Sequence, residues 1–328
     1  MSEALAALLA DSARWASKAL DPPVRSRITM SDKKPHVTVC ICTFRRPAWL
    51  RRLLESLERQ RTDCRFSYSV VVTDNDPHCS ARSVVEGFSV HTGAARPLYS
   101  NEPRMNIALA RNEALRHATG DFVAFIDDDE FPDPDWLMRM LDACERFQCA
   151  GVLGPVRPHF DHPPPPWILK GGFCERPEHP TGHVMDGQQC RTGNVLFRRR
   201  IIAGDDNVFR QEFGTGGEDK DFFMRLVQAG HVFRWCNEGI AYETVPPARW
   251  TRSYMLKRAL LRGNNNLKFR GQRIVLLGTS VLAVPIYSLI LPFTLLLGQH
   301  VFMKYCIRFC DHAGRLLAAL GLNPVKAR

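Results

Sequence analysis

The sequence predicts an α/β fold, in which a mostly parallel sheet has flanking helices and is followed by membrane-associated helices near the C-terminus. Short β-branched apolar runs alternate with amphipathic helical segments, polar residues follow the apolar runs, and 25 consecutive residues near the C-terminus carry no charge. The chain has 328 residues, of which 45% are hydrophobic and 24% charged. This length and composition allow a buried core and exclude wholesale disorder.

The elements of the first half follow in order after an N-terminal extension, residues 1–35. Short apolar runs predict strands over 37–42, 68–73 and 121–126. Apolar residues recurring at helical spacing predict helices over 47–57, 105–118 and 136–144. A strand–helix alternation of this kind is typical of a parallel sheet.

The second half of the chain is less regular. Strands are predicted over 152–156 and 194–198. Residues 157–190 are expected to be loops, and the prolines at 163–166 exclude a helix or a central strand there. Residues 214–219 form a glycine-rich turn that leads into another helix.

Eleven cysteines are scattered along the chain, and no pair has CxxC spacing. Neither a disulfide framework nor a zinc ribbon is therefore predicted. Cys40 and Cys42 fall on a predicted strand, whereas Cys306 and Cys310 fall on a predicted helix. We expect reduced, buried thiols, as in a cytosolic protein.

Basic residues are concentrated toward the C-terminus. Residues 249–273, here called the basic collar, contain eight Lys or Arg and no acidic residue. Residues 249–328 carry a net charge of +12, which leaves −2 for residues 1–248. Such a collar attracts phosphates, and its partner is a nucleic-acid backbone, a bound nucleotide or anionic lipid headgroups.

The uncharged stretch covers residues 274–298. The chain is therefore expected to have four regions, which are the extension, an α/β domain (36–248), the basic collar and a helical tail (274–328). About 20 apolar residues suffice to cross a bilayer. Pro285 and Pro292 predict a kink, and basic residues flank the stretch on both sides. These features favour a re-entrant or interfacial hairpin with both ends cytoplasmic. The alternative is a buried core helix of a soluble protein.

Three consecutive carboxylates, Asp127, Asp128 and Asp129, follow the strand over 121–126. Ligands of open α/β sheets bind beyond the carboxyl ends of the strands. Neighbouring carboxylates repel one another, and a divalent cation, magnesium or manganese, relieves that repulsion while binding phosphates. The pattern predicts a metal–diphosphate site, and the alternative is an acidic turn that caps the next helix.

Two further motifs fall at predicted edges. Thr43 and Asp74 end the first two strands, so they are expected to line the same edge of the sheet, where a nucleotide would lie. Asp74 alone is equally compatible with a helix N-cap. Gly216 and Gly217 let the backbone approach a ligand, and the following carboxylate, Asp219, is a candidate general base. The alternative is favourable acidic placement at a helix N-terminus.

Five segments, VTVCICTFRRP, VVVTDND, NIALARNEAL, FIDDDE and GGEDKDFF, resemble in order and spacing the motifs of family 2 glycosyltransferases of the GT-A fold. The resemblance covers about residues 36–270 and is strongest to bacterial exopolysaccharide enzymes such as the glucosyltransferases of succinoglycan assembly. The QxxRW motif of processive synthases is absent, which argues against a processive polymer synthase.

The resemblance implies a role for each matching residue. Asp129 would bind Mn²⁺ or Mg²⁺, and Asp127 would reach the ribose or share the metal. Asp219 would be the catalytic base of a Glu–Asp pair with Glu218. The remaining matching residues would hold the nucleotide sugar: Thr43, Arg45, Asp74, Arg111 and Asp128, with Arg258 and Arg262 on the diphosphate.

The expected function is inverting transfer of a sugar from a nucleotide diphosphate sugar, usually uridine-linked, to a glycan or lipid-linked glycan in cell-surface polysaccharide synthesis. The expected place is the cytoplasmic face of the bacterial inner membrane, with anionic lipid and not nucleic acid as partner. Two alternatives remain open: a metal-dependent nucleotidyltransferase or phosphohydrolase on a similar sheet, and a basic nucleic-acid-binding protein. No Walker A loop is present, which excludes a P-loop NTPase.

Overall fold

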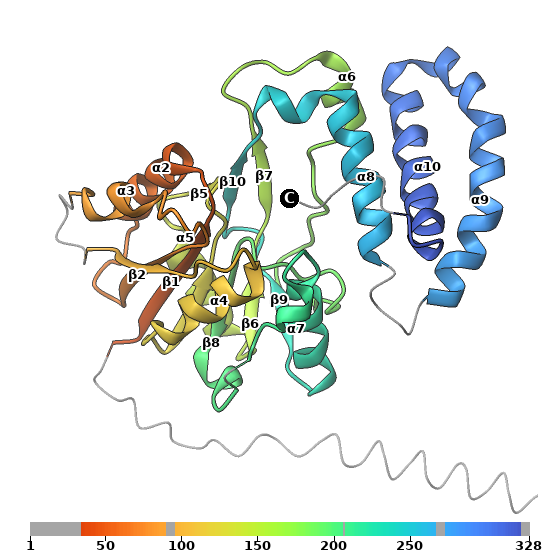
Figure 1. Ribbon diagram of the computed structural model, residues 1–328. Helices are drawn as coiled ribbons and strands as arrows, with labels where there is room; N and C mark the ends of the chain where they lie inside the picture. The colour runs from red at the N-terminus through yellow and green to blue at the C-terminus, as the bar shows by residue number, and fades with distance from the viewer. Residues whose placement is uncertain (1–33, 90–95, 206, 267–272, 323–328) are drawn as a thin grey trace, which may run out of the picture. The chain divides into compact units, whose positions relative to one another are not determined.

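The structure is a computed structural model, which describes residues 34–89, 96–205, 207–266 and 273–322 (Figure 1). Residues 35–328 form one compact unit. Residues 1–33 of the N-terminal extension lie outside the described residues, as do Lys268 and Arg270 of the basic collar.

A seven-stranded sheet forms the centre of this unit, in the order β3-β2-β1-β4-β8-β6-β9. Only β8 runs antiparallel to its neighbours, which confirms the predicted mostly parallel sheet. The strands are β1 (His36–Thr43), β2 (Ser67–Asp74), β3 (Leu98–Asn101), β4 (Phe122–Phe125), β6 (Gly151–Leu153), β8 (Val195–Arg198) and β9 (Phe233–Trp235).

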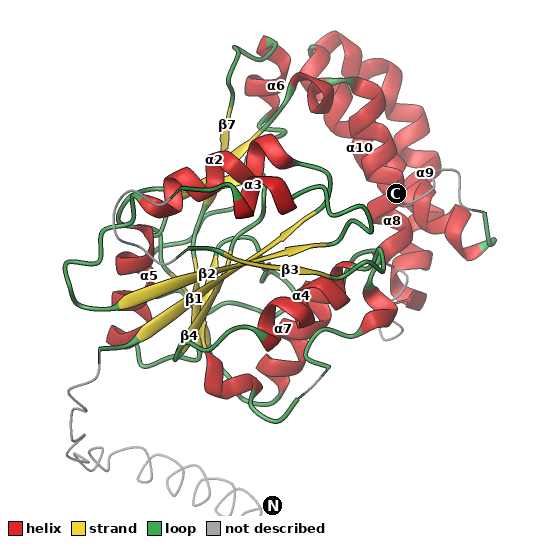
Figure 2. Ribbon diagram, turned by 60° about the vertical axis from the view of Figure 1, so that its left-hand side comes forward, coloured by secondary structure: helices red, strands yellow, loops and turns green. Residues whose placement is uncertain are grey.

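Helices cover both faces of the sheet (Figure 2). Burial of their apolar faces stabilises these short helices, because intrinsic helix propensity alone is weak at these lengths. These helices are α2 (Pro47–Glu58), α3 (Arg82–Glu86), α4 (Ile107–Arg116), α5 (Trp136–Arg146) and α7 (Glu218–Gln228). Short 3₁₀ turns connect some elements: η1 (Arg199–Ile202), η2 (Gln211–Phe213) and η3 (Pro247–Trp250).

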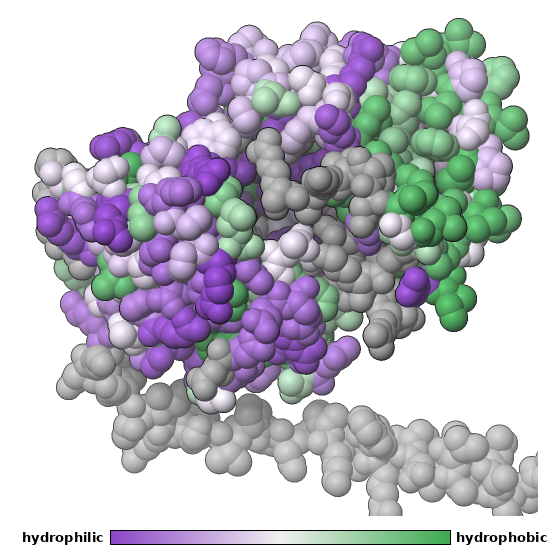
Figure 3. Space-filling view, in the orientation of Figure 1, coloured by the Kyte–Doolittle hydropathy of each residue, from purple (hydrophilic) through white to green (hydrophobic). Residues whose placement is uncertain are grey.

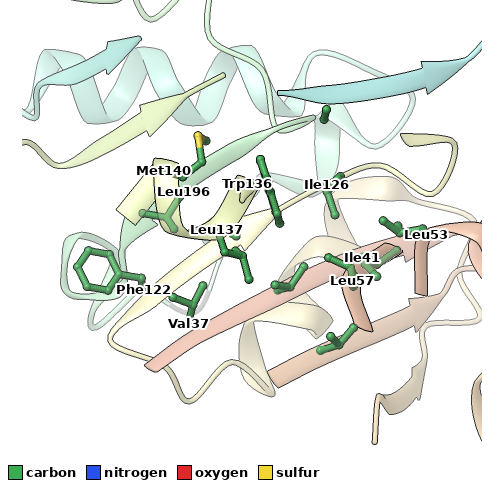
Figure 4. Packing of buried hydrophobic residues seen from close by; sticks show 14 of the residues in the cluster. Val37, Ile41, Leu53, Leu57, Phe122, Ile126, Trp136, Leu137, Met140 and Leu196 are labelled. Atoms are coloured by element: carbon green, nitrogen blue, oxygen red, sulfur yellow. The ribbon is translucent and has the colours of Figure 1, made fainter. Parts of the chain in front are cut away.

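Alternate residues of β1 serve two separate cores. Val37 and Ile41 pack with Leu53 of α2 and Trp136 of α5 on one face (Figure 4). Cys40 faces the other side, where α4 and α7 contribute the second cluster. Burial on both faces explains why this strand reads as a continuous apolar run in the sequence.

A small second sheet, in the order β5-β10-β7, lies beside the segment predicted as loops. Its strands are β5 (Glu130–Pro132), β7 (Val156–His159) and β10 (Ala241–Thr244). The single strand predicted over 152–156 is wrong in extent, because β6 and β7 belong to different sheets. The prediction that the prolines at 163–166 exclude a helix is also wrong for the last of them. Pro166 begins α6 (Pro166–Gly171), a position where the missing N–H leaves no bond unmade.

Three long helices end the chain: α8 (Arg252–Asn266), α9 (Arg273–Thr294) and α10 (Gln299–Ala319), with the 3₁₀ turn η5 (Leu295–Leu297) between the last two. The α10 helix packs against both α8 and α9. Pro285 and Pro292 lie inside α9, which continues through both as one α-helix. The prolines therefore do not break the helix, and the chain reverses only at η5.

The alternative that the uncharged stretch is a buried core helix is contradicted, because only 6% of its most apolar window is buried. Apolar residues gather over α9 in the space-filling view, whereas the α/β domain presents mostly polar surface (Figure 3). The segment from Arg273 to Leu297 has a mean hydropathy of 2.3 and is the one candidate membrane span among the described residues. All eleven cysteines are free thiols. The prediction that they are buried holds for Cys40 but is wrong for Cys42, Cys306 and Cys310, which are half-buried.

Candidate active site

The register of the sheet brings the predicted strand-end residues together. Thr43 pairs with Asp74 across β1 and β2, and Asp74 pairs with Asn101 of β3. The β4 strand lies on the other side of β1, so the three aspartates that follow it reach the same edge. The hydroxyl of Thr43 donates to Oδ2 of Asp128 at 2.8 Å and joins the two strand ends.

Arginine side chains, and not only a metal ion, neutralise much of the negative charge of this carboxylate cluster. Nη1 of Arg46 donates to Asp128 at 2.8 Å and to Asp129 at 3.2 Å. Nη2 of Arg249 donates to Asp129 at 2.7 Å, and its Nη1 donates to Glu243 at 2.5 Å. Burial raises the pKa of Asp128, although Arg46 and the Thr43 hydroxyl act in the opposite direction.

Asp127 is the most accessible of the three aspartates, with 47% of its side chain exposed, whereas 8% of the Asp129 side chain is exposed. Neighbouring protein atoms nevertheless desolvate the Asp127 carboxyl group in part, which raises its pKa to about 6. Arg111, with Nη2 3.8 Å from Oδ1 of Asp127, opposes the rise. Of the three carboxylates, Asp127 is the one most open to a ligand.

Arg111 links the strand-end carboxylates to the start of α7. Its buried guanidinium forms an ion pair with Glu218 and also faces Asp127. Burial raises the pKa of Glu218, and the charge of Arg111 lowers it in part. The other oxygen of Glu218 has no hydrogen-bond partner among the described residues. This geometry makes Arg111 a bridge between two motifs that are 107 positions apart in the sequence.

The two acidic residues at the start of α7 point in different directions. Gly216 and Gly217 adopt φ values of 119° and 100°, in the left-handed region that disfavours residues with a Cβ. They turn the chain so that Glu218 enters the interior while Asp219 lines a cleft. The pair predicted from the sequence is therefore divided into one buried and one accessible carboxylate.

The cleft has a volume of about 990 Å³ and reaches from the start of α7 to α8 and α10. We call it the basic cleft, because basic residues outnumber acidic ones along its lining. The basic residues are Arg176, Arg191, Lys220, Arg249, Arg258, Arg262, Lys304 and Arg308, and the acidic ones are Glu175, Asp219, Glu243 and Asp311. Asp127, Asp128 and Asp129 are not among its lining residues.

Asp74 and Arg45 lie at the same edge but have local partners. Asp74 is completely buried, and its carboxylate accepts the backbone N–H groups of Asp76 at 3.0 Å and Ala81 at 2.7 Å. Arg45 pairs with Asp76, both contacts being 3.2 Å. Asp74 thus holds the turn that follows β2, and the nucleotide-binding roles of Asp74 and Arg45 stay predictions.

Arg258 and Arg262 lie on α8. Both line the basic cleft, as does Asp219. Arg262 forms a two-pronged pair with Asp311 of α10, at 2.8 and 2.6 Å. Sequence reasoning assigned both arginines to the nucleotide diphosphate, and that role stays a prediction.

Sequence reasoning missed four charged residues that surround the triple aspartate. They are Arg46, Arg176, Glu130 and Arg249. Arg176 comes from the loop-rich segment, pairs with Glu243 and lies 3.8 Å from Glu130. Burial raises the pKa of Glu130 well above its ordinary value. Arg46 and Glu130 lie within the quoted motifs and Arg249 begins the basic collar, but none of these patterns shows that they contact the aspartates, because those contacts arise from the tertiary fold.

The donor chemistry fits a divalent cation held by few protein ligands. Six carboxylates (Asp127, Asp128, Asp129, Glu130, Glu218 and Glu243) face four guanidinium groups (Arg46, Arg111, Arg176 and Arg249), which leaves an excess of negative charge. Among the described residues, no group of three or more His, Cys, Asp or Glu is arranged to hold an ion by itself. Magnesium commonly takes one or two carboxylates and completes its shell with water and phosphates. The assignment of Asp127 and Asp129 as metal ligands stays a prediction.

Comparison with known proteins gives the family. The model of glycosyl transferase family 2 matches residues 38–203. The succinoglycan biosynthesis protein ExoM of Rhizobium meliloti (strain 1021) is 36% identical over 245 residues, covering 72% of this chain and 76% of that protein.

The chain belongs to glycosyl transferase family 2. The hyaluronan synthase of Pasteurella multocida is 23% identical over 69% of this chain, which spans only 26% of that synthase. The crystal structure of S. aureus TarS 1-349 in complex with UDP-GlcNAc superposes with a TM-score of 0.51 at 15% identity, covering 88% of this chain and 93% of that chain.

Family membership and the structural likeness confirm the GT-A fold and the glycosyltransferase class. The fold is shared with a protein of low sequence identity because strand order and helix placement outlast individual side chains. The two alternatives left open by the sequence, a nucleotidyltransferase or phosphohydrolase and a nucleic-acid-binding protein, are set aside in favour of this family.

Proposed function

We propose that this family 2 glycosyltransferase inverts the anomeric centre as it transfers a sugar from a UDP-linked donor to a glycan or lipid-linked glycan in cell-surface polysaccharide synthesis. One observation carries the proposal: Arg111 fixes Glu218 beside Asp127 and leaves Asp219 facing the basic cleft. The candidate base for the acceptor thus follows directly after the residue that Arg111 links to Asp127.

The donor is proposed from the strand-end site and from the relatives. Thr43, Asp127 and Asp128 lie at the edge where ligands of α/β sheets bind. A structural neighbour was solved in complex with UDP and with UDP-GlcNAc, and a relative acts in succinoglycan biosynthesis by its name. A nucleoside diphosphate at this edge would meet Arg46 and Arg249, which already lie against the aspartates.

Asp127 and Asp129 would hold Mn²⁺ or Mg²⁺, whose chemistry here is to neutralise negative charge on the departing diphosphate. Asp129 is at present paired with Arg46 and Arg249. These arginines orient the carboxylate. They also offer donors to phosphate oxygens, since guanidinium groups bind phosphates in two-pronged geometry.

Proton transfer is assigned to Asp219. Its carboxylate accepts the proton of an acceptor hydroxyl as that oxygen attacks the anomeric carbon. The nucleoside diphosphate leaves from the opposite side, so one displacement inverts the centre and no enzyme nucleophile is needed. Glu218 is buried and paired with Arg111, which makes it a positioning residue rather than the base.

We propose that the enzyme associates with the cytoplasmic face of the inner membrane through residues 249–320. The exposed apolar residues of α9 support this, because water penalises such a surface and a bilayer does not. Leu282 and Leu289 are 68% and 73% exposed. Asp substitutions at both positions should release the protein from membranes in a high-salt wash, whereas Lys257→Gln with Arg273→Gln should only weaken retention. Full retention of the Asp variant contradicts this anchor.

A binding screen tests the donor site. UDP and a panel of nucleotide sugars are titrated into the full-length enzyme with Mn²⁺ and with a chelator. We expect binding of at least one UDP-linked sugar that depends on Mn²⁺ and that Asp129→Asn removes, because that variant deletes a ligand charge. Binding that is unaffected by chelator and by Asp129→Asn removes the metal site from this account.

A further inference from the structure

The far end of the basic cleft carries three cations from the C-terminal helices. Arg258 comes from α8, and Lys304 and Arg308 come from α10. None of the three has a carboxylate partner within ion-pair distance among the described residues, whereas Arg176 and Arg249 at the near end are both paired. Unpaired cations that line a concave surface attract an anion.

The α10 helix presents two different faces. Lys304, Arg308 and Asp311 line the cleft, and their spacing of four and three residues places them on one side of the helix. Tyr305 and His312, seven residues apart, contact Tyr287 of α9 on another side. One helix therefore separates the basic cleft from the apolar helix α9.

This arrangement sets three requirements on a cleft ligand. A hydroxyl must reach Asp219, which lines the same cleft. An anionic group matches Arg258, Lys304 and Arg308. An apolar tail attached to the same molecule would lie in the layer that receives α9, whose residues such as Ile274 and Leu289 are 87% and 73% exposed.

We propose that Arg258, Lys304 and Arg308 form a binding site for the phosphate or diphosphate that links the acceptor glycan to its lipid. The proposal rests on the glycosyltransferase function proposed above and assigns these residues to the acceptor rather than to the nucleotide. Arg249 lines the cleft and pairs with Asp129 at the near end, whereas Arg258, Lys304 and Arg308 come from α8 and α10 rather than from the strand ends. Arg262 differs from its neighbours, because Asp311 already holds its guanidinium.

The test compares two full-length variants with equal loss of charge. Lys304→Gln with Arg308→Gln removes two cations from the cleft, and Lys257→Gln with Arg273→Gln removes two exposed cations that do not line it. Each is titrated with phosphatidylcholine vesicles containing a long-chain prenyl diphosphate. A second titration uses vesicles in which phosphatidylglycerol supplies the same charge, and a third uses soluble UDP with Mn²⁺.

We expect the cleft variant to bind prenyl-diphosphate vesicles at least about 100-fold more weakly than the control variant, because two charge-assisted hydrogen bonds to phosphate are lost. The two variants should bind phosphatidylglycerol vesicles equally and UDP like the unmodified enzyme. Arg258→Gln should bind prenyl-diphosphate vesicles more weakly than its neighbour Lys257→Gln does in the same assay. Equal loss in both variants on both vesicles means general charge attraction and overturns the proposal.

Two other outcomes also overturn it. Loss of UDP affinity in the cleft variant assigns the cations to the nucleotide, and unchanged vesicle binding leaves them without this role. Vesicle binding requires neither donor nor metal. If the unmodified enzyme fails to bind UDP while the vesicle difference holds, the proposed function fails and the anion site stands.

Discussion

Leu53 in α2 and Leu289 in α9 are both leucines on helices, but Leu53 is completely buried and Leu289 is 73% exposed. In the α/β domain, apolar helix faces meet a sheet (Figure 4), and polar groups gather where strands end. In the C-terminal region, α9 keeps its apolar surface outward (Figure 3). The difference teaches that the sheet buries the apolar side chains of the first region's helices, whereas those of α9 lie on the surface, where water penalises them.

The largest expected effect is a loss of turnover in the α/β domain without a loss of its fold. Asp219→Asn should lower turnover by about 10³-fold while UDP binding and the melting temperature stay unchanged, because only proton removal depends on this accessible carboxylate. Steady-state rates with a competent acceptor and a thermal melt measure this. The control is Glu218→Gln, which should lower the melting temperature, since Glu218 is buried against Arg111. A dead Glu218→Gln with an active Asp219→Asn assigns the base to the other carboxylate.

The next effect concerns the buried bridge between the two motifs. Arg111→Met leaves Glu218 as an unpaired buried charge, so we expect a loss of about 3–5 kcal/mol in the free energy of unfolding. The double variant Arg111→Met with Glu218→Gln should recover part of that loss, because the uncompensated charge is gone. Urea unfolding of all four proteins gives the coupling. Additive losses would show that the pair does not act as a unit.

A third prediction applies one substitution to both regions. Leu53→Ala should destabilise the enzyme by about 2–5 kcal/mol, because it leaves a cavity under the sheet. Leu289→Ala should change the free energy of unfolding by less than about 0.5 kcal/mol in mild detergent, since its side chain contacts little protein. Urea denaturation measures both. Equal losses would mean that Leu289 is buried by a protein partner, such as a second copy.

The smallest effect lies within the C-terminal helices. A Cβ built at Gly314 of α10 would come 2.3 Å from the carbonyl oxygen of Leu260 in α8, whereas nothing lies within 4 Å at Gly278 of α9. Gly314→Ala should therefore push α10 away from α8 and destabilise that packing by about 1–3 kcal/mol. Gly278→Ala should stabilise its helix by about 0.5–1 kcal/mol. Hydrogen exchange of α8 and α10 reports the change, and unaltered protection in Gly314→Ala contradicts this close approach.

Much of the fold was predictable because its signals are local. The β1 strand has apolar residues on both faces, and α2 and α5 repeat leucines at helical spacing, so periodicity located each of them. The short strand β3 and the five-residue helix α3 were missed, because four or five residues carry little periodic signal. Splitting β6 from β7 requires knowledge of which sheet each strand joins, and no local pattern contains that.

The sequence by itself determined the order of motifs, the triple aspartate after β4, the Glu–Asp pair after two glycines, and the uncharged stretch with its basic neighbour. These are properties of residue type and spacing. Only the tertiary structure decided that Glu218 turns inward to Arg111 while Asp219 lines the cleft, and that Arg249 reaches Asp129 from 120 positions away. Such pairings arise when sheet register and helix packing bring distant segments together, and a charge finds its partner by distance in space rather than by separation along the chain.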